Sequence, residues 1–425
     1  MSEFKEVAIG TQLKLTSGFP FASSNFSNEG FPLIRIRDVL TSQTETYYQG
    51  VFLPGYIVKK GDILVGMDGE FHVTRWRGVD ALLNQRVLKV EVKNESLVVL
   101  DFLFHWLGPF IKKVNDITAA TTVKHLSTKD LTKAKAFFPE VKAQKKIAAI
   151  LTATDTAIEK TEALIAKYQQ IKAGLIHDLF TRGVLPNGQL RPSYEQEPEL
   201  YHETEIGWIP REWKVVRMVS LAEDRNGSTT IGPFGSDLVA TDYRLEGVPV
   251  VFVRDVKESG FQWNSDTYIS ERKAQQLNAH SVKSGEVLAT KMGLPPCISC
   301  VYPDWMSNGV VTADMVRLSP DRKKVDALWL ATAINHDRVK RQVAAITAGV
   351  TRPKITLADF RAIKIAKPEL DEQKRMSLRI TALREKLDKE LTQVEKLKKQ
   401  KLGLMHDLLT GKVPVKVDIP ETADA

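Results

Sequence analysis

Four predicted loop regions in the first third of the chain carry side chains that could contact nucleic acid bases. The third of them, Met67–Arg77, places basic, aromatic and polar groups between glycines. An arginine there could donate two hydrogen bonds to guanine O6 and N7, and His72 could act as a further donor. The candidates, from stretches 17–24, 35–38, 67–77 and 118–125, are Ser17, Phe19, Arg35, Arg37, Asp68, His72, Arg75, Arg77, Thr122 and Lys124.

A second set of four stretches has the same character later in the chain. Lysines and arginines in them could add affinity by contacting phosphates, without selecting a sequence. For any single residue the alternative is a solvated surface charge or an ion pair, as Arg37 could form with Asp38. The candidates, from stretches 227–237, 254–255, 291–294 and 347–354, are Ser228, Thr229, Ser236, Arg254, Lys291, Thr351, Arg352 and Lys354.

Cys297 and Cys300 have the spacing of a metal-binding or redox pair. Structural zinc needs four ligands, and the chain has no second pair of cysteines. A thioredoxin-like site would need a βαβ context that the surrounding sequence does not show. We therefore expect two ordinary buried thiols, and neither a metal nor a cofactor.

Histidine–aspartate pairs occur at 177–178 and 406–407 and could suggest catalysis. Both fall in the last turns of predicted helices, where a histidine cation interacts favourably with the helix dipole. Their repetition favours shared packing or a partner contact instead. The stretch 294–297, Leu-Pro-Pro-Cys, lacks the polar and aromatic residues of an adenine-methyltransferase motif, and the sequence has no glycine-rich phosphate loop. We therefore expect no catalytic residue.

The candidate residues belong to a chain that repeats itself. Residues 139–184 match residues 368–413 without a gap, at a constant offset of 229 that relates His177 to His406. The chain is therefore two related halves joined head to tail. A protein with two copies of one architecture usually contacts a target that itself has two parts.

The gapless repeat has the period of a long helix. Its seam residues alternate spacings of four and three over about five heptads in each copy, which is typical of a coiled coil. A helix over about 142–181 would be roughly 60 Å long. Two such helices most simply pair with each other, in either direction. The expected seam is Ile147, Leu151, Thr154, Ile158, Thr161, Ile165, Tyr168, Lys172, Leu175 and Leu179, with Met376, Ile380, Leu383, Leu387, Glu390, Val394, Leu397, Lys401, Leu404 and Leu408.

The segments before each helix have short apolar runs separated by Gly, Pro and Ser, a pattern that predicts strands and turns. Helical stretches are expected at 97–114 and 325–345. Motifs repeat more loosely here: the Arg-Asp-Val at 37–39 returns at 254–256, an offset of 217 that grows to 229 by residue 118. The growing offset predicts small loop insertions in the second copy.

Length and composition limit the class of protein. A chain of 425 residues is too long for one core, and 43% hydrophobic residues argue against disorder. A net charge of +8 suits a polyanionic partner, although 60 basic residues are nearly offset by 52 acidic ones. No apolar run could span a bilayer, the start does not resemble a signal peptide, and only two cysteines occur. These features favour a cytoplasmic protein.

The expected fold class is α+β, with two mixed α/β domains separated by two long helices that pair as a coiled coil, and an internal pseudo-twofold duplication. The expected segments are globular domains at 1–138 and 205–367, helical spacers at 139–184 and 368–413, a polar linker at 185–204 and a tail at 414–425.

Three motifs, taken in order, resemble the specificity subunit of type I restriction-modification systems, and the resemblance covers essentially the whole chain. They are Ile206-Gly-Trp-Ile-Pro-Arg-Glu-Trp-Lys214, the stretch 32–38 with its copy at 249–255, and 368–373 followed by a long helix and 403–413. The resemblance implies two target-recognition domains, each reading one half of a split, asymmetric site in double-stranded DNA, with the paired helices setting the gap. It also implies a non-catalytic subunit that binds two adenine methyltransferase subunits, which motor-nuclease subunits join in the restriction form.

The first half departs from this pattern in two places. It lacks the Gly-Trp…Trp opening before Phe4, which favours a different strand packing there, and it has Ala143 where the second half has Glu372. One competing hypothesis is a coiled-coil scaffold whose globular heads bind proteins. Another, a stand-alone nuclease or methyltransferase, is disfavoured by the missing motifs.

Overall fold

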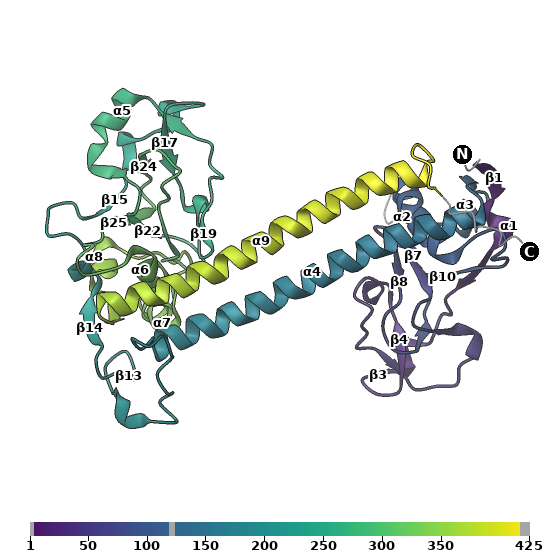
Figure 1. The fold of residues 1–425 in the computed structure, drawn as a ribbon, viewed down its shortest axis with the longest axis horizontal. Coiled ribbons are helices and arrows are strands. Elements are labelled where there is room, and N and C mark those ends of the chain that lie inside the picture. The colour runs from purple at the N-terminus through teal and green to yellow at the C-terminus, as the bar shows by residue number, and fades with distance from the viewer. Residues whose placement is uncertain (1–3, 119–123, 417–425) are drawn as a thin grey trace, which may run out of the picture. The chain divides into compact units, whose positions relative to one another are not determined.

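The computed structural model describes residues 4–118 and 124–416. The chain divides into two compact units: unit 1 comprises Met1–Leu164 with Glu390–Ala425, and unit 2 comprises Ile165–Lys389. Two long helices, α4 (Val141–Thr181) and α9 (Leu370–Leu409), contribute to both units (Figure 1). Each unit thus contains one globular domain, called domain 1 in unit 1 and domain 2 in unit 2, together with half of each long helix.

Domain 1 is built on two sheets and a short strand pair. The antiparallel four-stranded sheet has the order β2-β10-β7-β8, the five-stranded sheet has the order β3-β5-β4-β9-β6, and β1 pairs with β11. The strands are β1 (Lys5–Ala8), β2 (Leu13–Ser17), β3 (Phe26–Ser27), β4 (Phe31–Ile34), β5 (Tyr47–Tyr48), β6 (Ile57–Val58), β7 (Ile63–Gly66), β8 (His72–Arg75), β9 (Ala81–Leu83), β10 (Val87–Val92) and β11 (Lys135–Phe138). The helices are α1 (Ile9–Gln12), α2 (Leu100–Ile117) and α3 (Thr128–Thr132).

Domain 2 repeats this plan. Its sheets have the orders β15-β25-β22-β23 and β16-β20-β17-β24-β21, and β14 pairs with β26. The strands are β12 (Tyr201–His202), β13 (Ile209–Pro210), β14 (Lys214–Arg217), β15 (Thr229–Ile231), β16 (Tyr243–Arg244), β17 (Val248–Val251), β18 (Val256–Lys257), β19 (Gly260–Phe261), β20 (Tyr268–Ile269), β21 (Ser281–Val282), β22 (Val287–Thr290), β23 (Ser299–Val301), β24 (Gly309–Val311), β25 (Met315–Leu318) and β26 (Lys364–Lys367). The helices are α5 (Glu271–Gln276), α6 (Ala327–Ile334), α7 (Asp337–Ile346) and α8 (Leu357–Ala362).

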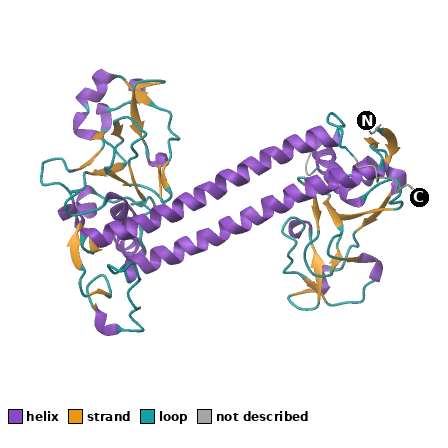
Figure 2. Ribbon diagram, in the orientation of Figure 1, coloured by secondary structure: helices purple, strands orange, loops and turns teal. Residues whose placement is uncertain are grey.

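The two domains match strand by strand, including a parallel pair in each, β4 with β9 and β17 with β24. Domain 2 adds the hairpin β18-β19 between β17 and β20, and helix α5 between β20 and β21. The described part of domain 1 has shorter connections at both places. The expected loop insertions in the second copy are therefore confirmed. Figure 2 shows the strands in the globular domains and α4 and α9 as uninterrupted helices.

The long helix expected over 142–181 is confirmed by α4, and its copy by α9. In unit 1, Lys401 Nζ lies 2.6 Å from Asp155 Oδ1 and Lys398 Nζ lies 2.8 Å from Glu162 Oε1. Moving forward along α4 thus means moving backward along α9. The helices are antiparallel in this unit, a direction that the sequence left open.

The same direction holds in unit 2, where Arg375 Nη2, near the start of α9, donates to Val184 O, just past the end of α4, at 3.2 Å. The polar seam position Lys172 faces Arg384, and burial together with that cation lowers the pKa of Lys172. Most apolar seam positions are buried, as a coiled coil requires. They are Ile147, Leu151, Ile158, Ile165, Leu179, Met376, Ile380, Leu383, Leu387, Val394 and Leu408.

A buried glutamine joins each long helix to its domain. Gln144 Oε1 accepts from the Val99 N–H at 2.8 Å, and its Nε2 donates to Leu97 O and Pro139 O, both at 2.9 Å. Gln373 repeats this: Oε1 accepts from a backbone N–H at 2.9 Å, and Nε2 donates to two carbonyls at 3.3 and 2.8 Å. The first turn of each spacer helix is therefore fixed by the same three bonds.

The expected difference in strand packing at the N-terminus is wrong. β1 pairs with β11 from Lys5–Phe138 to Ala8–Lys135, and β14 pairs with β26 in the equivalent register. The pairing is retained because it depends on backbone hydrogen bonds, which the missing tryptophan does not supply.

The segment 185–204 is more than the plain polar linker that its composition predicts. Arg191 within it is 5% exposed, and its guanidinium forms an ion pair with Glu372 of α9. Leu185 N–H donates to Gln189 O at 2.8 Å, which closes a turn in the same segment. The segment therefore packs against α9 in unit 2. From residue 417 onward, the expected tail lies outside the described residues.

The helix expected over 325–345 is instead two helices, α6 and α7. The break falls at Asn335, whose side chain exchanges hydrogen bonds with the Ser299 backbone at 2.8 and 2.9 Å. The His336 side chain then caps the start of α7. Among the described residues, no helix combines the length and apolarity that a membrane crossing needs.

Candidate nucleic-acid interface

Each domain contains a short turn that displays an arginine. In domain 1, the Asp38 carboxylate accepts from the backbone N–H three residues earlier at 2.8 Å, and Asp38 is buried. In domain 2, the Asp255 carboxylate makes the equivalent bond at 2.8 Å and is also buried. Each aspartate closes a 3₁₀ turn. The repeated Arg-Asp motif thus places an exposed arginine, Arg37 or Arg254, at an equivalent position in both domains.

Several contacts hold Arg254 in place. Asp255 also accepts from the Ser265 hydroxyl at 2.5 Å and the Asn264 N–H at 2.9 Å. The Arg254 guanidinium lies 4.5 Å from the centroid of the Phe252 ring, and Nη2 donates to Ser265 O at 3.4 Å. The turn is thus rigid, whereas the guanidinium is at the surface.

Arg37 is held more loosely. Its Nε lies 3.6 Å from Asp38 Oδ1, and its Nη2 lies 3.5 Å from Thr46 Oγ1. The ion pair that the sequence suggested as an alternative is therefore present. The Arg37 side chain is nevertheless 63% exposed, so the guanidinium can still contact a ligand. Arg35, two residues earlier, is exposed as well.

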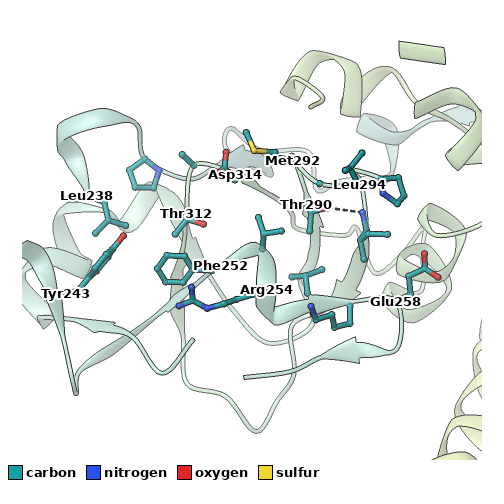
Figure 3. A pocket seen from close by; sticks show the side chains of 18 of the residues that line it. Leu238, Tyr243, Phe252, Arg254, Glu258, Thr290, Met292, Leu294, Thr312 and Asp314 are labelled. Atoms are coloured by element: carbon teal, nitrogen blue, oxygen red, sulfur yellow. Dashed lines mark hydrogen bonds between the residues drawn. The ribbon is translucent and has the colours of Figure 1, made fainter. Parts of the chain in front are cut away.

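A cleft of about 820 Å³ opens in domain 2 beside Arg254 (Figure 3). Its lining includes residues of three of the four stretches predicted for this domain: Pro233 and Gly235, Arg254, and 292–294. In Figure 3, Arg254 lies on the opposite side of the cleft from Met292. Stretches separated by up to about 60 residues in sequence thus form one concave surface.

The fourth stretch adjoins the third through backbone contacts. Met292 and Lys354 form an antiparallel bridge, and the Ile355 N–H donates to Lys291 O at 2.9 Å. Thr351, Arg352 and Lys354 are exposed. All four predicted stretches of domain 2 therefore lie in or beside the cleft.

The cleft combines cations with apolar and acidic groups. Lys291 Nζ lies 5.1 Å from the centroid of the Phe234 ring, a cation–π contact, and Lys257 lines the cleft beside Arg254. Glu258 and Asp314 supply acceptors, and Lys340 pairs with Glu258 at 2.8 Å. Such a surface can bind phosphates through its cations and donate hydrogen bonds to base edges through Arg254.

Two predicted residues of domain 2 are buried and bonded within the domain. Thr229 is 3% exposed, and its hydroxyl accepts from Arg361 Nε at 2.6 Å. Ser228 is 8% exposed, and its carbonyl accepts from the Ser319 N–H at 2.7 Å. Ser236, in the same stretch, is exposed next to the cleft residue Gly235.

The first stretch of domain 1 leaves its sheet at Ser17, an exposed residue at the end of β2. Phe19 is 41% exposed, with its ring centroid 5.1 Å from that of Phe21 and 5.2 Å from that of Tyr56. A Cβ on Gly18 would lie 1.9 Å from Asn84 O. Glycine is therefore needed where this stretch crosses the neighbouring loop.

The third and fourth stretches of domain 1 meet at Asp68. It bridges to His125, whose Nδ1 lies 2.6 Å from Asp68 Oδ1, and its other oxygen pairs with Arg86. Lys124 Nζ donates to Asn115 O at 2.6 Å. The predicted contact Thr122 lies outside the described residues.

The prediction of one loop over 67–77 is wrong, because β8 occupies His72–Arg75. His72 Nδ1 contacts Glu70 O at 2.8 Å, and Nε2 is buried without a hydrogen-bond partner among the described residues. Arg75 pairs with Asp101 at 2.7 Å, and Arg77 pairs with Glu159 of α4. Both arginines line a second cleft of about 670 Å³ beside α4 and α9, within unit 1.

The predicted residues omitted an aromatic side chain beside the domain 2 cleft and a cation in its lining, Lys257. Phe234 is 58% exposed and contacts Lys291, and the Gly-Pro that precedes it was the available signal. Lys257 lies in the β18-β19 hairpin, an insertion in domain 2, so comparing the two halves could not reveal it.

The two thiols are buried, as expected: Cys297 is 4% exposed and Cys300 is 3% exposed. Burial raises the pKa of each to about 12, so neither is an activated nucleophile. Across the described residues, no cluster of three or more His, Cys, Asp or Glu side chains could hold a metal ion. Both His-Asp pairs lie in the last turns of α4 and α9, as expected from the sequence.

Comparison with protein families gives a match over more than half of the chain. The model of the type I restriction modification DNA specificity domain matches residues 1–169 and 261–399. The type I restriction enzyme EcoBI specificity subunit of Escherichia coli is 29% identical over 385 residues, covering 89% of this chain and 78% of that protein. The MjaVIII specificity subunit of Methanocaldococcus jannaschii is 23% identical over 422 residues, covering 97% and 90%.

Solved structures show the same fold. The S subunit of a type I restriction-modification system from M. genitalium aligns with a TM-score of 0.61 at 14% identity, over 96% of both chains. A chain from a study of complex assembly and conformational transition in a type I system aligns with a TM-score of 0.53 at 15% identity, over 97% of this chain and 98% of that one.

Proposed function

Because the chain belongs to the type I restriction-modification DNA specificity family, we propose that each of its domains reads one half of a bipartite, asymmetric site in double-stranded DNA. The observation that carries this proposal is the pair of Arg-Asp turns. They present Arg37 and Arg254 at equivalent positions, beside loops of unlike sequence. One scaffold with two different sets of loops suits a target with two different halves.

The surface residues divide by expected role. Arg37 and Arg254 donate to base edges, and the exposed basic residues beside them contact phosphates. Ser228 and Thr229 keep their loop in shape and do not contact bases directly. The remaining proposed contacts are Ser17, Phe19, Arg35, Asp68, Lys124, Ser236, Lys291, Thr351, Arg352 and Lys354, with Arg75 and Arg77 a separate pair beside α4 and His72 in the same strand as Arg75.

Single-arginine variants test the assignment of half-sites. Arg254→Ala should weaken recognition at a position in one half-site by about 1–3 kcal/mol, and Arg37→Ala should do the same in the other half-site. The measurement is methylation mapping in cells that carry the chain with its methyltransferase. Arg211→Ala, which removes an exposed arginine outside the four stretches of domain 2 and outside both clefts, is the matched control. If both variants lost recognition in the same half-site, the proposal that each domain reads a different half-site would be contradicted.

The two helices, we propose, set the gap between the half-sites. Support comes from their gapless repetition and from the buried seam that both units share. One heptad inserted between Leu164 and Ile165 and another between Lys389 and Glu390 leaves each unit's own contacts intact. The pair lengthens by roughly 10 Å, so the gap should grow by about three base pairs while both half-sites stay the same.

A single insertion is the control for that design. It shifts one helix against the other and should destroy the seam, so methylation should fall sharply. A double insertion that leaves the gap unchanged would exclude a helical ruler.

The proposed partners are two adenine methyltransferase subunits, joined by motor-nuclease subunits in the restriction form, in the cytoplasm. The chain itself supplies recognition and no catalysis. Purified chain incubated with DNA, Mg²⁺ and S-adenosylmethionine should leave the DNA unmodified, and adding the methyltransferase subunit should produce methylation at one split site.

Salt dependence separates this proposal from a scaffold with protein-binding heads. For DNA binding, the logarithm of the affinity falls with the logarithm of salt concentration, with a slope near 0.9 per phosphate contacted. Protein scaffolding would respond far less. A flat salt profile, with no sequence-selective footprint in the presence of the methyltransferase, would favour the scaffold.

A further inference from the structure

Exposed apolar side chains gather around the domain 2 cleft. Leu294 is 88% exposed, Phe234 is 58% exposed and Met292 is 37% exposed. Met292 and Leu294 line the cleft, opposite Arg254 (Figure 3). A single exposed leucine is ordinary, whereas several around one cleft indicate a binding surface.

The loop that carries Leu294 is held at its base. The Cys297 N–H donates to Thr290 O at 2.7 Å, and the Thr290 N–H donates to Ile298 O at 2.8 Å. Met292 bridges to Lys354, which fixes the other side. The apolar tip is therefore presented by a fixed loop.

The equivalent loop of domain 1 has the opposite chemistry. Asp68 bridges to His125 as Met292 bridges to Lys354, and the glycine that follows each has a positive φ, 72° at Gly69 and 148° in the domain 2 loop. The next residue is an exposed Glu70 in domain 1 and Leu294 in domain 2. The same structural position thus presents a carboxylate in one domain and an apolar chain in the other.

Bases differ in which of these groups they attract. Carboxylates accept hydrogen bonds from the amino group of cytosine, whereas apolar side chains contact the 5-methyl group of thymine. Cations beside the loop, Lys291, Arg254 and Lys354, match the charge of a nucleic acid backbone rather than that of an apolar protein surface.

We propose that Leu294, supported by Met292, reads a thymine 5-methyl group in the half-site of domain 2. The equivalent position in domain 1 makes no such contact. This assignment rests on the proposed DNA-recognition function, and it adds a specificity-determining residue whose chemical target is a methyl group.

The test replaces thymine by deoxyuridine, which removes only the methyl group. A duplex carrying the mapped site is bound by the chain in complex with its methyltransferase. Deoxyuridine in the domain 2 half-site should weaken binding roughly three- to fivefold, as expected for one buried methyl group. The same exchange in the gap between the half-sites should leave the affinity unchanged.

Leu294→Ala should remove the deoxyuridine sensitivity while leaving the fold intact, because the side chain is 88% exposed. Glu70→Ala, at the equivalent place in domain 1, should leave the sensitivity as it is. Equal affinity for thymine and deoxyuridine, a domain 2 half-site without any A·T pair, or unchanged sensitivity in Leu294→Ala would overturn the inference. Absence of any split site would instead refute DNA recognition itself.

Discussion

In each unit, an aromatic ring packs against the glycine that follows the end of a long helix, but the chemistry of that ring differs between the units. In unit 2, a Cβ on Gly183, just past α4, would lie 2.7 Å from the Trp213 ring; in unit 1, a Cβ on Gly411, just past α9, would lie 2.7 Å from the Phe4 ring. An aromatic residue thus packs on a glycine with positive φ in both. The tryptophan is polar at one edge and the phenylalanine is not.

The difference between the two aromatic rings is matched by a difference between the two long helices, Glu372 in α9 and Ala143 in α4. Glu372 accepts from Trp213 Nε1 at 3.2 Å and from the Val184 N–H at 2.8 Å, and it binds Arg191 through both oxygens. Ala143, the equivalent of Glu372, is buried in unit 1. The two departures of the first half from the second are therefore one change, from a buried polar network to apolar packing.

Glu372→Ala should have the largest effect of the changes considered. It removes the buried carboxylate that binds the Arg191 guanidinium through both oxygens and leaves the exposed Glu212, 3.5 Å from Arg191 Nε. Breaking a buried ion pair in this way typically costs about 3–5 kcal/mol. The free energy of unfolding from urea titration measures the loss, and hydrogen exchange should locate it in unit 2. Loss of exchange protection in unit 1 alone would contradict the comparison.

The reciprocal change sharpens the same point. Ala143→Glu buries a carboxylate in unit 1, and residues 410–425, which follow α9, contain no arginine that could take the part of Arg191. The change should therefore also destabilise the protein. Combining Glu372→Ala with Arg191→Met and Trp213→Phe imitates unit 1 and should restore most of the stability, since an apolar replacement of a whole buried network is often close to neutral.

The glutamine anchors should respond alike in both units. Gln144→Ala and Gln373→Ala each remove the partner of one buried and two partly buried backbone groups, at a cost of about 1–3 kcal/mol. Urea titration of each variant measures the loss. Costs that differ by more than about 1 kcal/mol would show that the two anchors, despite identical bonds, are not equivalent.

Each unit also contains a buried histidine, and these make stability depend on pH. Burial, the main cause, lowers the pKa of His105 to about 4 in unit 1 and that of His336 to about 4 in unit 2. The unfolded chain therefore binds more protons between pH 6.5 and 4, and stability falls as the pH falls through this window. Each histidine should cost about 2 kcal/mol at pH 5 relative to pH 8.

Unfolding titrations across that pH range measure the effect. His105→Gln should flatten the profile of unit 1 and leave that of unit 2 unchanged, with His336→Gln as the converse. A pH profile that keeps its slope in the double variant would show that other groups cause it.

The smallest expected effect is at the surface of unit 1. Lys398 and Glu162 are both 48% exposed, and their pair should contribute less than about 1 kcal/mol. Lys398→Ala should change the unfolding midpoint only slightly, and added salt should remove the difference. A larger loss would mean that the helix seam depends on this pair.

Local patterns predicted the parts of the fold that local forces determine. The seam period located α4 and α9 because apolar spacing reflects the face that a helix buries. The direction of pairing, the packing of Arg191 and the break at Asn335 were not predictable, because each depends on a partner far away in sequence, 181 residues in the case of Arg191 and Glu372.

The candidate site shows the same limit. Loop composition identified the stretches that line the domain 2 cleft. It did not reveal that the Thr229 hydroxyl accepts a hydrogen bond from Arg361, 132 residues later in the sequence. Nor did it reveal that His72 and Arg75 belong to strand β8 and not to a loop. Short strands with mixed polarity, such as β8, carry little periodic signal.

The division of the chain affects the order in which the protein can form during synthesis. Unit 2 is one contiguous segment, whereas the core of unit 1 includes Leu408 and Leu409 from the end of α9, packed with Ile147 and Leu151. At about 5–20 residues per second, these leucines emerge from the ribosome roughly 10–50 s after domain 1. The domain synthesised first is thus the last to complete its core, and until then it exposes an apolar surface that a chaperone or a partner subunit could cover.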